Sequence, residues 1–168
     1  MTLFDFLNNS NATGVYFAIL GLALATALAC WGSAKAVGMV GQAAGGLLTE
    51  DPSKFGKALL LQALPGTQGI YGMIVSFIGI VKMGLFGGSL VALTPADGLY
   101  LLFACLPIAI VGYLSALHQG KVAVAGINLL SKRPDEVGKA ITSAALVETY
   151  AIFALLISLL LVLFAPIG

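Results

Sequence analysis

Four long apolar stretches alternate with short polar segments along the chain. They run over Gly14–Ala34, Ala58–Val81, Leu99–Leu117 and Ala140–Ala165. A helix needs about 20 predominantly apolar residues to cross the hydrocarbon core of a bilayer, and each stretch supplies roughly that number. The pattern therefore predicts an all-α membrane protein with four transmembrane helices, arranged as two helical hairpins.

Capping residues indicate where the later helices begin. Thr94 and Pro95 form an N-cap and first-turn pair ahead of the third stretch. Asp51–Pro52 precedes the second stretch, and Pro134–Glu136 precedes the fourth. These signals place polar, capped turns between the membrane-spanning segments.

The composition agrees with a membrane protein. Hydrophobic residues make up 60% of the 168 residues and charged residues only 9%, whereas a soluble domain carries about 25% charged residues to face water. The formal net charge of +1 offers no surface for nucleic acid. Cys30 and Cys105 both lie in apolar stretches, and we expect buried free thiols there rather than a disulfide.

The basic residues indicate an orientation in the membrane. Five of the eight Lys and Arg residues lie in two loops, around residues 49–57 and 131–139. Lys35 and Lys121 lie near the ends of their apolar stretches on the same side as these loops, and only Lys82 lies on the other side. Basic residues concentrate in cytoplasmic loops, so we expect these two loops to be cytoplasmic. Both termini then lie outside a cell membrane that the chain crosses several times.

The two halves of the chain are similar to each other. A shift of 82 residues places Pro52 on Pro134 and Gly56–Ala58 on Gly138–Ala140. The expected organisation is a first hairpin repeat, an outer connection and a second hairpin repeat, over residues 1–82, 83–97 and 98–168. Each repeat holds an even number of spans, so the two repeats should run in parallel through the membrane.

The first helix is unusually rich in glycine and alanine. Small side chains allow close approach of helix backbones in lipid. Two interpretations remain open: a crowded inner helix that lines a ring of subunits, or ordinary packing within one bundle.

Glu148 is the single acid inside an apolar stretch. A carboxylate at this depth costs several kcal/mol on translocon scales, so its default interpretation is functional. The structural alternative is a hydrogen bond between helices from a protonated glutamic acid.

Depth arithmetic brings other polar residues to the level of Glu148. Gln119 and Glu148 are equally far along the chain from the turn of the last hairpin, about 22 Å at a rise of 1.5 Å per residue. Thr67 and Gln68 reach the same level from the turn of the first hairpin. Tyr71 lies one helical turn beyond Thr67 on the same face. We therefore expect these five side chains to meet.

One carboxylate, two carboxamides, a hydroxyl and a phenol suit a hard monovalent cation, because such ions prefer oxygen ligands. A single negative charge favours Na⁺ over Ca²⁺. A site for protons alone would need only the carboxyl group, and the two glutamines could instead serve as hydrogen bonds between helices. Pro65 should break the second helix beside the site and free the carbonyl of Leu61. Pro107 is expected to be a harmless kink.

Three motifs carry a resemblance to a known family. They are LPGTQGIYG at Leu64–Gly72, HQGKV at His118–Val122 and LVETYAI at Leu146–Ile152. Together they resemble the membrane rotor subunit of V-type ATPases, the proteolipid, over nearly the whole chain. The resemblance is greatest to the sodium-pumping bacterial branch.

The resemblance implies a ligand set for Na⁺, with H⁺ as the competing ion. The ligands are the side chains of Thr67, Gln68, Gln119 and Glu148 and the backbone carbonyl of Leu64, and Tyr71 closes the site by a hydrogen bond. This backbone ligand is the carbonyl of Leu64, whereas the helix break at Pro65 is expected to free the carbonyl of Leu61.

The resemblance also implies a homo-oligomeric ring in membrane lipid that rotates against a stator subunit with a conducting arginine, and that joins central-stalk subunits of the V-type ATPase. Other subunits would hydrolyse or make ATP, because the sequence has no phosphate-binding loop and no nucleophile–base pair. Three alternatives remain: a rotor that carries H⁺, a four-helix small multidrug cation carrier, and a purely structural membrane protein.

Overall fold

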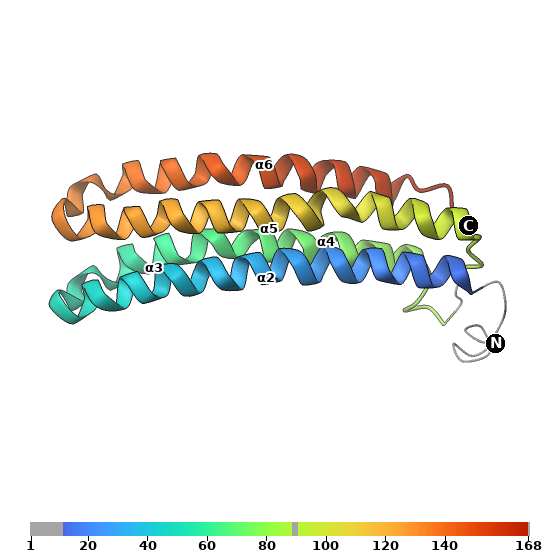
Figure 1. The fold of residues 1–168 in the computed structure, drawn as a ribbon, viewed down its shortest axis with the longest axis horizontal. Helices are drawn as coiled ribbons and strands as arrows, with labels where there is room; N and C mark the ends of the chain where they lie inside the picture. The colour runs from blue at the N-terminus through green and yellow to red at the C-terminus, as the bar shows by residue number, and fades with distance from the viewer. Residues whose placement is uncertain (1–11, 89–90, 168) are drawn as a thin grey trace.

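Four long helical segments lie side by side in the computed structural model, which describes residues 12–88 and 91–167 (Figure 1). Two of them are continuous helices of 38 residues each, α2 (Thr13–Glu50) and α5 (Pro95–Lys132). The second segment consists of η1 (Pro52–Lys54), α3 (Phe55–Ala63), η2 (Leu64–Gly66) and α4 (Thr67–Lys82). The fourth consists of η3 (Pro134–Glu136) and α6 (Val137–Leu163).

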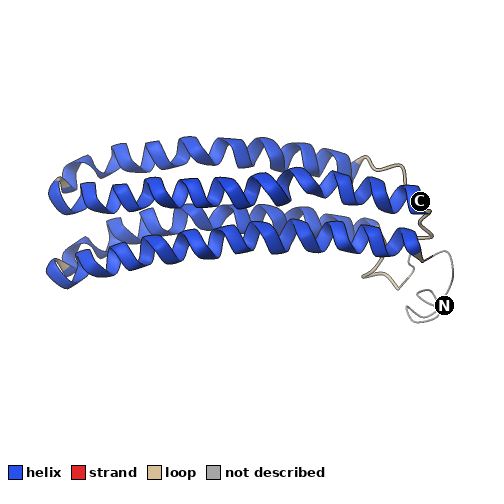
Figure 2. Cartoon of the chain, in the orientation of Figure 1, coloured by secondary structure: helices blue, strands red, loops and turns tan. Residues whose placement is uncertain are grey.

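The described residues form helices and connecting turns and no strand (Figure 2). All four segments are long and apolar enough to cross a membrane. The predicted all-α fold with four spans in two tandem hairpins is confirmed.

The helices α2 and α5 extend well beyond the spans expected from the apolar stretches. At 1.5 Å per residue, 38 residues measure about 57 Å, against about 30 Å for the hydrocarbon core. The extension of α2 is held by packing, since Val40, Ala44 and Leu47 are buried. The apolar stretches end at Ala34 and Leu117 because the polar residues Lys35 and His118 follow them, whereas the helices continue.

The predicted helix starts are confirmed. Thr94 and Asp97 form a capping box at the start of α5. The Asp51 carboxylate accepts a hydrogen bond from the backbone N–H of Ser53 at the start of η1. Pro134 begins a 3₁₀ turn that leads into α6.

The two internal prolines act differently, as expected. Pro65 lies in η2, a 3₁₀ turn that separates α3 from α4. By contrast, α5 continues through Pro107. The hydroxyl of Ser158 accepts a hydrogen bond from the backbone N–H of Ile108 at 3.1 Å, which joins α5 to α6 just after that proline.

Glycines allow α2 and α5 to pack backbone against backbone. A Cβ atom added at Gly32 would lie 2.6 Å from the carbonyl oxygen of Tyr113, and one at Gly120 would lie 2.8 Å from the Cβ of Ala36. At Gly38 an added Cβ would meet nothing within 4 Å. Packing within the chain thus accounts for glycines such as Gly32 and Gly120, but not for Gly38.

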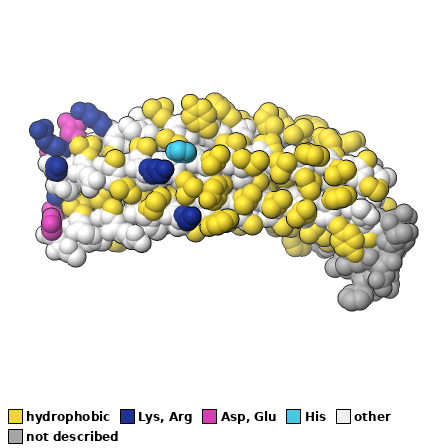
Figure 3. All heavy atoms as spheres, viewed as in Figure 1, with side chains coloured by type: hydrophobic (Ala, Val, Ile, Leu, Met, Phe, Trp, Pro, Cys, Tyr) yellow, Lys and Arg dark blue, Asp and Glu magenta, His cyan; other side chains and the backbone are white. Residues whose placement is uncertain are grey.

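The two hairpin turns lie at one end of the bundle and are joined to each other. Lys54 Nζ donates to the carbonyl oxygen of Ser131 at 3.1 Å, and Lys57 Nζ donates to that of Pro134 at 3.0 Å. Charged side chains gather at this end, which we call the hairpin end, while apolar side chains cover most of the remaining visible surface (Figure 3).

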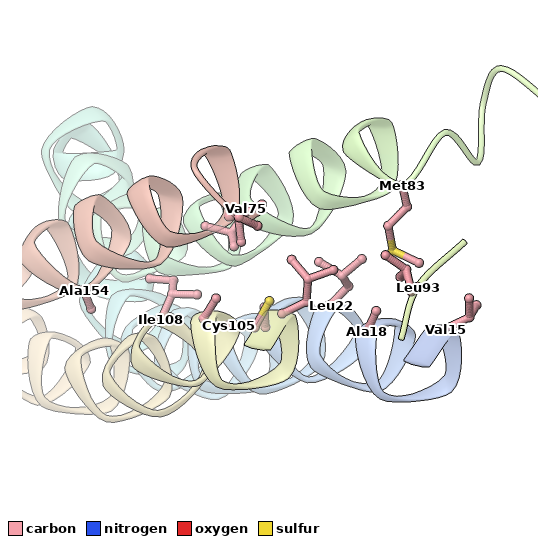
Figure 4. Close-up of a cluster of buried hydrophobic side chains, with 14 residues drawn as sticks. Val15, Ala18, Leu22, Val75, Met83, Leu93, Cys105, Ile108 and Ala154 are labelled. Carbon is pink, nitrogen blue, oxygen red and sulfur yellow. The ribbon is translucent and has the colours of Figure 1, made fainter. Parts of the chain in front are cut away.

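Two clusters of buried apolar side chains form the core. One lies toward the end where α2 begins and includes Leu22, Val75 and Ile108 (Figure 4). The other lies toward the hairpin end and includes Leu61 and Ile127. The stretch of bundle between them contains the buried polar side chains described below.

The two cysteines are free thiols, but only one of them is buried. Cys105 belongs to the cluster shown in Figure 4. The expectation that Cys30 is buried as well is wrong for the isolated chain. Its thiol lies 3.7 Å from the carbonyl oxygen of Gly69, at the contact between α2 and α4.

Candidate ion-binding site

A cluster of polar side chains in the middle of the bundle is formed by residues of α4, α5 and α6. Gln68 at the start of α4 and Gln119 in α5 are fully buried. Thr67, Tyr71 and Glu148 are half-buried, so this cluster reaches the surface of the chain on the side of the carboxylate. The five side chains that were expected to meet, four of them at one level and Tyr71 one helical turn beyond, do meet.

The 3₁₀ turn η2 positions Thr67 and Gln68. Pro65 interrupts the helix, and the chain resumes as α4 at Thr67. The backbone N–H and the Oγ1 of Thr67 both donate to the carbonyl oxygen of Leu64, the latter at 3.0 Å. The Leu64 carbonyl therefore lies next to Thr67, whereas Leu61 packs in the apolar cluster toward the hairpin end.

The carboxylate of Glu148 is held on both oxygens by neutral donors. Tyr71 Oη donates to Oε1 at 2.5 Å, and Gln119 Nε2 donates to Oε2 at 3.3 Å. Within the described residues, ion pairs join Lys54 to Asp51 and Lys139 to Glu136, and none involves Glu148. A carboxylate that lies within a membrane-spanning helix without an opposite charge beside it is suited to bind a cation.

The two glutamines form a directed chain of hydrogen bonds. Gln68 Nε2 donates to Gln119 Oε1 at 2.5 Å, and Gln119 Nε2 donates onward to the carboxylate. Gln68 Oε1 lies 3.4 Å from Thr67 Oγ1. The oxygens of Thr67 and Gln68 keep lone pairs that could bind an ion beside the Leu64 carbonyl.

Ser115 also belongs to this cluster, and the depth arithmetic does not identify it. Its Oγ donates to the carbonyl oxygen of Val147 at 3.0 Å and accepts from Gln68 Nε2 at 3.4 Å. Ser115 lies one helical turn before Gln119 on the same face of α5. That spacing is the signal from which the sequence could have identified it.

Comparison with known proteins places the chain in a family. The family model for the ATP synthase C subunit matches residues 20–79 and again residues 102–161. The chain belongs to the ATP synthase C-subunit family. The two matched segments are related by the same 82-residue shift as the internal repeat, so each hairpin corresponds to one copy of the family unit.

Two characterised members are similar over most of the chain. The V-type sodium ATPase subunit K of Enterococcus hirae is 48% identical over 161 residues, which cover 96% of this chain and 99% of that protein. The A-type ATP synthase subunit K of Methanocaldococcus jannaschii is 37% identical over 142 residues, which cover 84% of this chain and 60% of that protein. The chain is therefore a V-type ATPase proteolipid of the subunit K kind, a multi-pass membrane protein, and not a small multidrug carrier.

Proposed function

We propose that this chain is a rotor-ring subunit of a V-type ATPase, and that it binds Na⁺ at Glu148 and carries it across the membrane. The observation that carries the proposal is the Glu148 carboxylate itself. It lies within a membrane-spanning helix, is held by Tyr71 and Gln119, and has the neutral oxygens of Thr67 and Gln68 beside it.

The choice of Na⁺ rests on the number and kind of oxygens. The proposed ligands are Glu148, Gln119, Thr67, Gln68 and the backbone carbonyl of Leu64, and Tyr71 closes the site from the surface. One charge with several neutral oxygens matches a hard monovalent cation. The name of the 48% identical relative, a V-type sodium ATPase subunit K, supports the same ion.

In this proposal Na⁺ and H⁺ compete for one carboxyl group, because the group cannot bind both at once. The subunit works in a homo-oligomeric ring in the lipid. A stator subunit supplies an arginine that displaces the ion from Glu148, and central-stalk subunits couple rotation of the ring to ATP hydrolysis or synthesis elsewhere in the complex. The hairpin end, with the loops near 49–57 and 131–139, faces the cytoplasm, and the termini lie outside.

Carbodiimide labelling tests the site and the ion together. Dicyclohexylcarbodiimide reacts with the protonated carboxylic acid, so the purified oligomer should be labelled at Glu148 and the Glu148→Gln variant should not. Added Na⁺ should slow labelling, and less Na⁺ should suffice as the pH rises, because fewer protons then compete. Equal ionic strength supplied as K⁺ should protect much less, because the larger ion fits the site poorly.

The outcomes separate the two ions. Labelling of Glu148 that is slowed by Na⁺ supports the sodium rotor. Labelling that is indifferent to Na⁺ from mildly acidic to alkaline pH would overturn the choice of Na⁺ and would assign H⁺ to the same carboxyl group.

A further inference from the structure

Ser115 lies at a junction of three helices beneath the proposed ligands. Its hydroxyl, on α5, contacts the carbonyl oxygen of Val147 on α6 and the carboxamide nitrogen of Gln68 on α4. Ser115 is 5% exposed and Gln68 is fully buried, so water does not compete for these bonds. The two hydrogen bonds of this serine determine which atoms of the neighbouring residues can lie against its hydroxyl.

The hydroxyl of Ser115 can only accept a hydrogen bond from Gln68. Its one proton is committed to the Val147 carbonyl at 3.0 Å. A lone pair therefore faces Gln68, and only the nitrogen end of that carboxamide can lie there without repulsion between two acceptors. The Nε2 atom of Gln68 lies 3.4 Å away, as this requires.

The polarity of Gln68 decides whether the site can bind a cation. With Nε2 directed at Ser115 and Gln119, the Oε1 atom is directed at the side of Thr67 and the Leu64 carbonyl. A rotation of the carboxamide by 180° would direct its N–H groups at an ion in that place. It would also bring Gln68 Oε1 against two other hydrogen-bond acceptors, Ser115 Oγ and Gln119 Oε1. We propose that Ser115 is a positioning residue that fixes the carboxamide of Gln68 with its oxygen toward the ion.

The role of Ser115 differs from that of the other contact of Gln68. Gln119 is itself oriented by the Glu148 carboxylate, to which its Nε2 donates. Protonation of Glu148 weakens that constraint, because a carboxylic acid can donate as well as accept. Ser115 does not touch Glu148, and its partner is a backbone carbonyl that does not titrate. It therefore maintains the orientation of Gln68 whether Glu148 holds a proton or an ion.

The internal repeat supplies a matched control. Ser33 on α2 corresponds to Ser115 by the 82-residue shift, and it is buried to a similar extent, at 6% exposed. Its hydroxyl accepts a hydrogen bond from the backbone N–H of Gly69 at 2.9 Å, so it orients no ligand side chain. If protection by Na⁺ weakened only because a buried hydroxyl was removed, Ser33→Ala and Ser115→Ala should weaken it equally.

The inference rests on the proposed function, and the experiment tests both in sequence. Protection of Glu148 by Na⁺ against carbodiimide is first measured on the unmodified ring. Ser115→Ala should then require about three- to tenfold more Na⁺ for half-protection, the effect of one buried hydrogen bond. Ser33→Ala should stay within about twofold of the unmodified ring, and Ser115→Thr, which keeps the hydroxyl, should recover most of the loss.

A second readout distinguishes positioning from general damage. Without Na⁺, labelling of Glu148 should reach the same final extent in Ser115→Ala as in the unmodified ring, because Ser115 makes no hydrogen bond to the carboxyl group and the ring stays assembled. An unchanged Na⁺ requirement in Ser115→Ala, or an equal loss in Ser33→Ala, overturns the role of Ser115 alone. An unmodified ring that Na⁺ does not protect overturns the proposed function, and the inference with it.

Discussion

The two halves of the chain carry the same threonine in different surroundings. Thr67 Oγ1 donates to the carbonyl oxygen of Leu64 at 3.0 Å, and Thr149 Oγ1 donates to that of Leu146 at 2.8 Å. The local bond is the same at both positions of the repeat. Only Thr67 has a buried carboxamide beside it, at 3.4 Å. The neighbouring residues, and not the threonine itself, make one position a candidate ligand.

Removal of a neutral ligand should weaken Na⁺ binding while the charge remains. We expect Thr67→Ala and Gln119→Ala each to raise the Na⁺ dissociation constant by about tenfold, because each deletes one oxygen worth roughly 1–2 kcal/mol. Binding of ²²Na⁺ to the purified oligomer measures this. Thr149→Ala is the control and should bind as the unmodified chain does. Unchanged affinity in both ligand variants would contradict the shared-site geometry.

Asp51, outside the membrane, also depends on its neighbours, which lower its pKa. The Ser53 hydroxyl donates to its Oδ1 at 2.5 Å, and this bond is the main reason that the pKa of Asp51 lies below its ordinary value. A lowered pKa in the folded state means that the contribution of Asp51 to stability is present above the ordinary value of 3.8 and is lost as the pH falls through the lowered one.

Ser53→Ala should therefore raise the pKa of Asp51 toward its ordinary value, because the ionised carboxylate loses its nearest donor. An NMR pH titration of the chain in detergent, with labelled aspartate, measures this. Ser131→Ala, a substitution at the neighbouring turn, should leave the titration unchanged. A pKa that stays equally low in Ser53→Ala would assign the effect to the two donors that the variant keeps, the backbone N–H of residue 53 and Lys54, which lies 3.3 Å from Asp51 Oδ2.

At the scale of elements, the close contact of α2 with α5 determines where the other helices can lie. Their backbones approach at glycine positions, because no hydrophobic effect drives helices together in lipid and van der Waals contact must do so. Near the middle of the bundle, Gly32 lies against the backbone of Tyr113. This contact holds α5, with Ser115 and Gln119 on its next turns, at a fixed distance from α2.

Gly32→Ala should destabilise the fold by about 1–3 kcal/mol, because an added methyl group would meet backbone atoms that cannot rotate away. Thermal unfolding in detergent, followed by helical circular dichroism, measures the loss. Gly138→Ala at the start of α6 is the control, since an added Cβ there meets nothing within 4 Å. That variant should be neutral or slightly more stable, because alanine favours helix. Equal midpoints for the two variants would show that the α2–α5 contact tolerates expansion.

At the scale of the whole molecule, the four segments are covered unequally. In the most apolar part of each segment, 44% of the residues of α5 are buried inside the chain, but only 22% of those in the segment that contains α6. Large apolar side chains of α6 are exposed, among them Leu146 at 64% and Phe153 at 61%. Membrane lipid and neighbouring copies of the chain are the partners that such a surface suits, because exposed apolar area of this extent is unfavourable in water.

The whole molecule is expected to assemble into a closed ring with cyclic symmetry. We expect α2 and α5 on the inner side, and α3, α4 and α6 on the outer side. Copies of the chain that contact each other through one repeated heterologous interface form a closed ring when the rotation between neighbours is a whole fraction of 360°. Native mass spectrometry in mild detergent should find one large oligomer of identical chains. Monomers or dimers as the only species would contradict the ring.

The four spans, the parallel repeat and the starts of the helices can all be predicted from the amino-acid sequence. Each of these depends on local properties: runs of apolar residues, proline and capping residues, and a period that two segments share. The constant rise per residue of a helix also places Glu148, Gln119, Thr67 and Gln68 at one depth, with Tyr71 one helical turn beyond Thr67. Their roles as ion ligands remain predictions.

The tertiary structure decided which atoms of these residues meet. Depth along a helix leaves its rotation open, and only packing fixes that rotation. The α2–α5 contact and the turn at Pro65 set the rotation of α5 and α4, which directs Gln68 Nε2 at Ser115 and Gln119. They also place the carbonyl oxygen of Leu64 beside Thr67. Hydrogen bonds between side chains on different helices depend on this rotation, and no pattern along one helix specifies it.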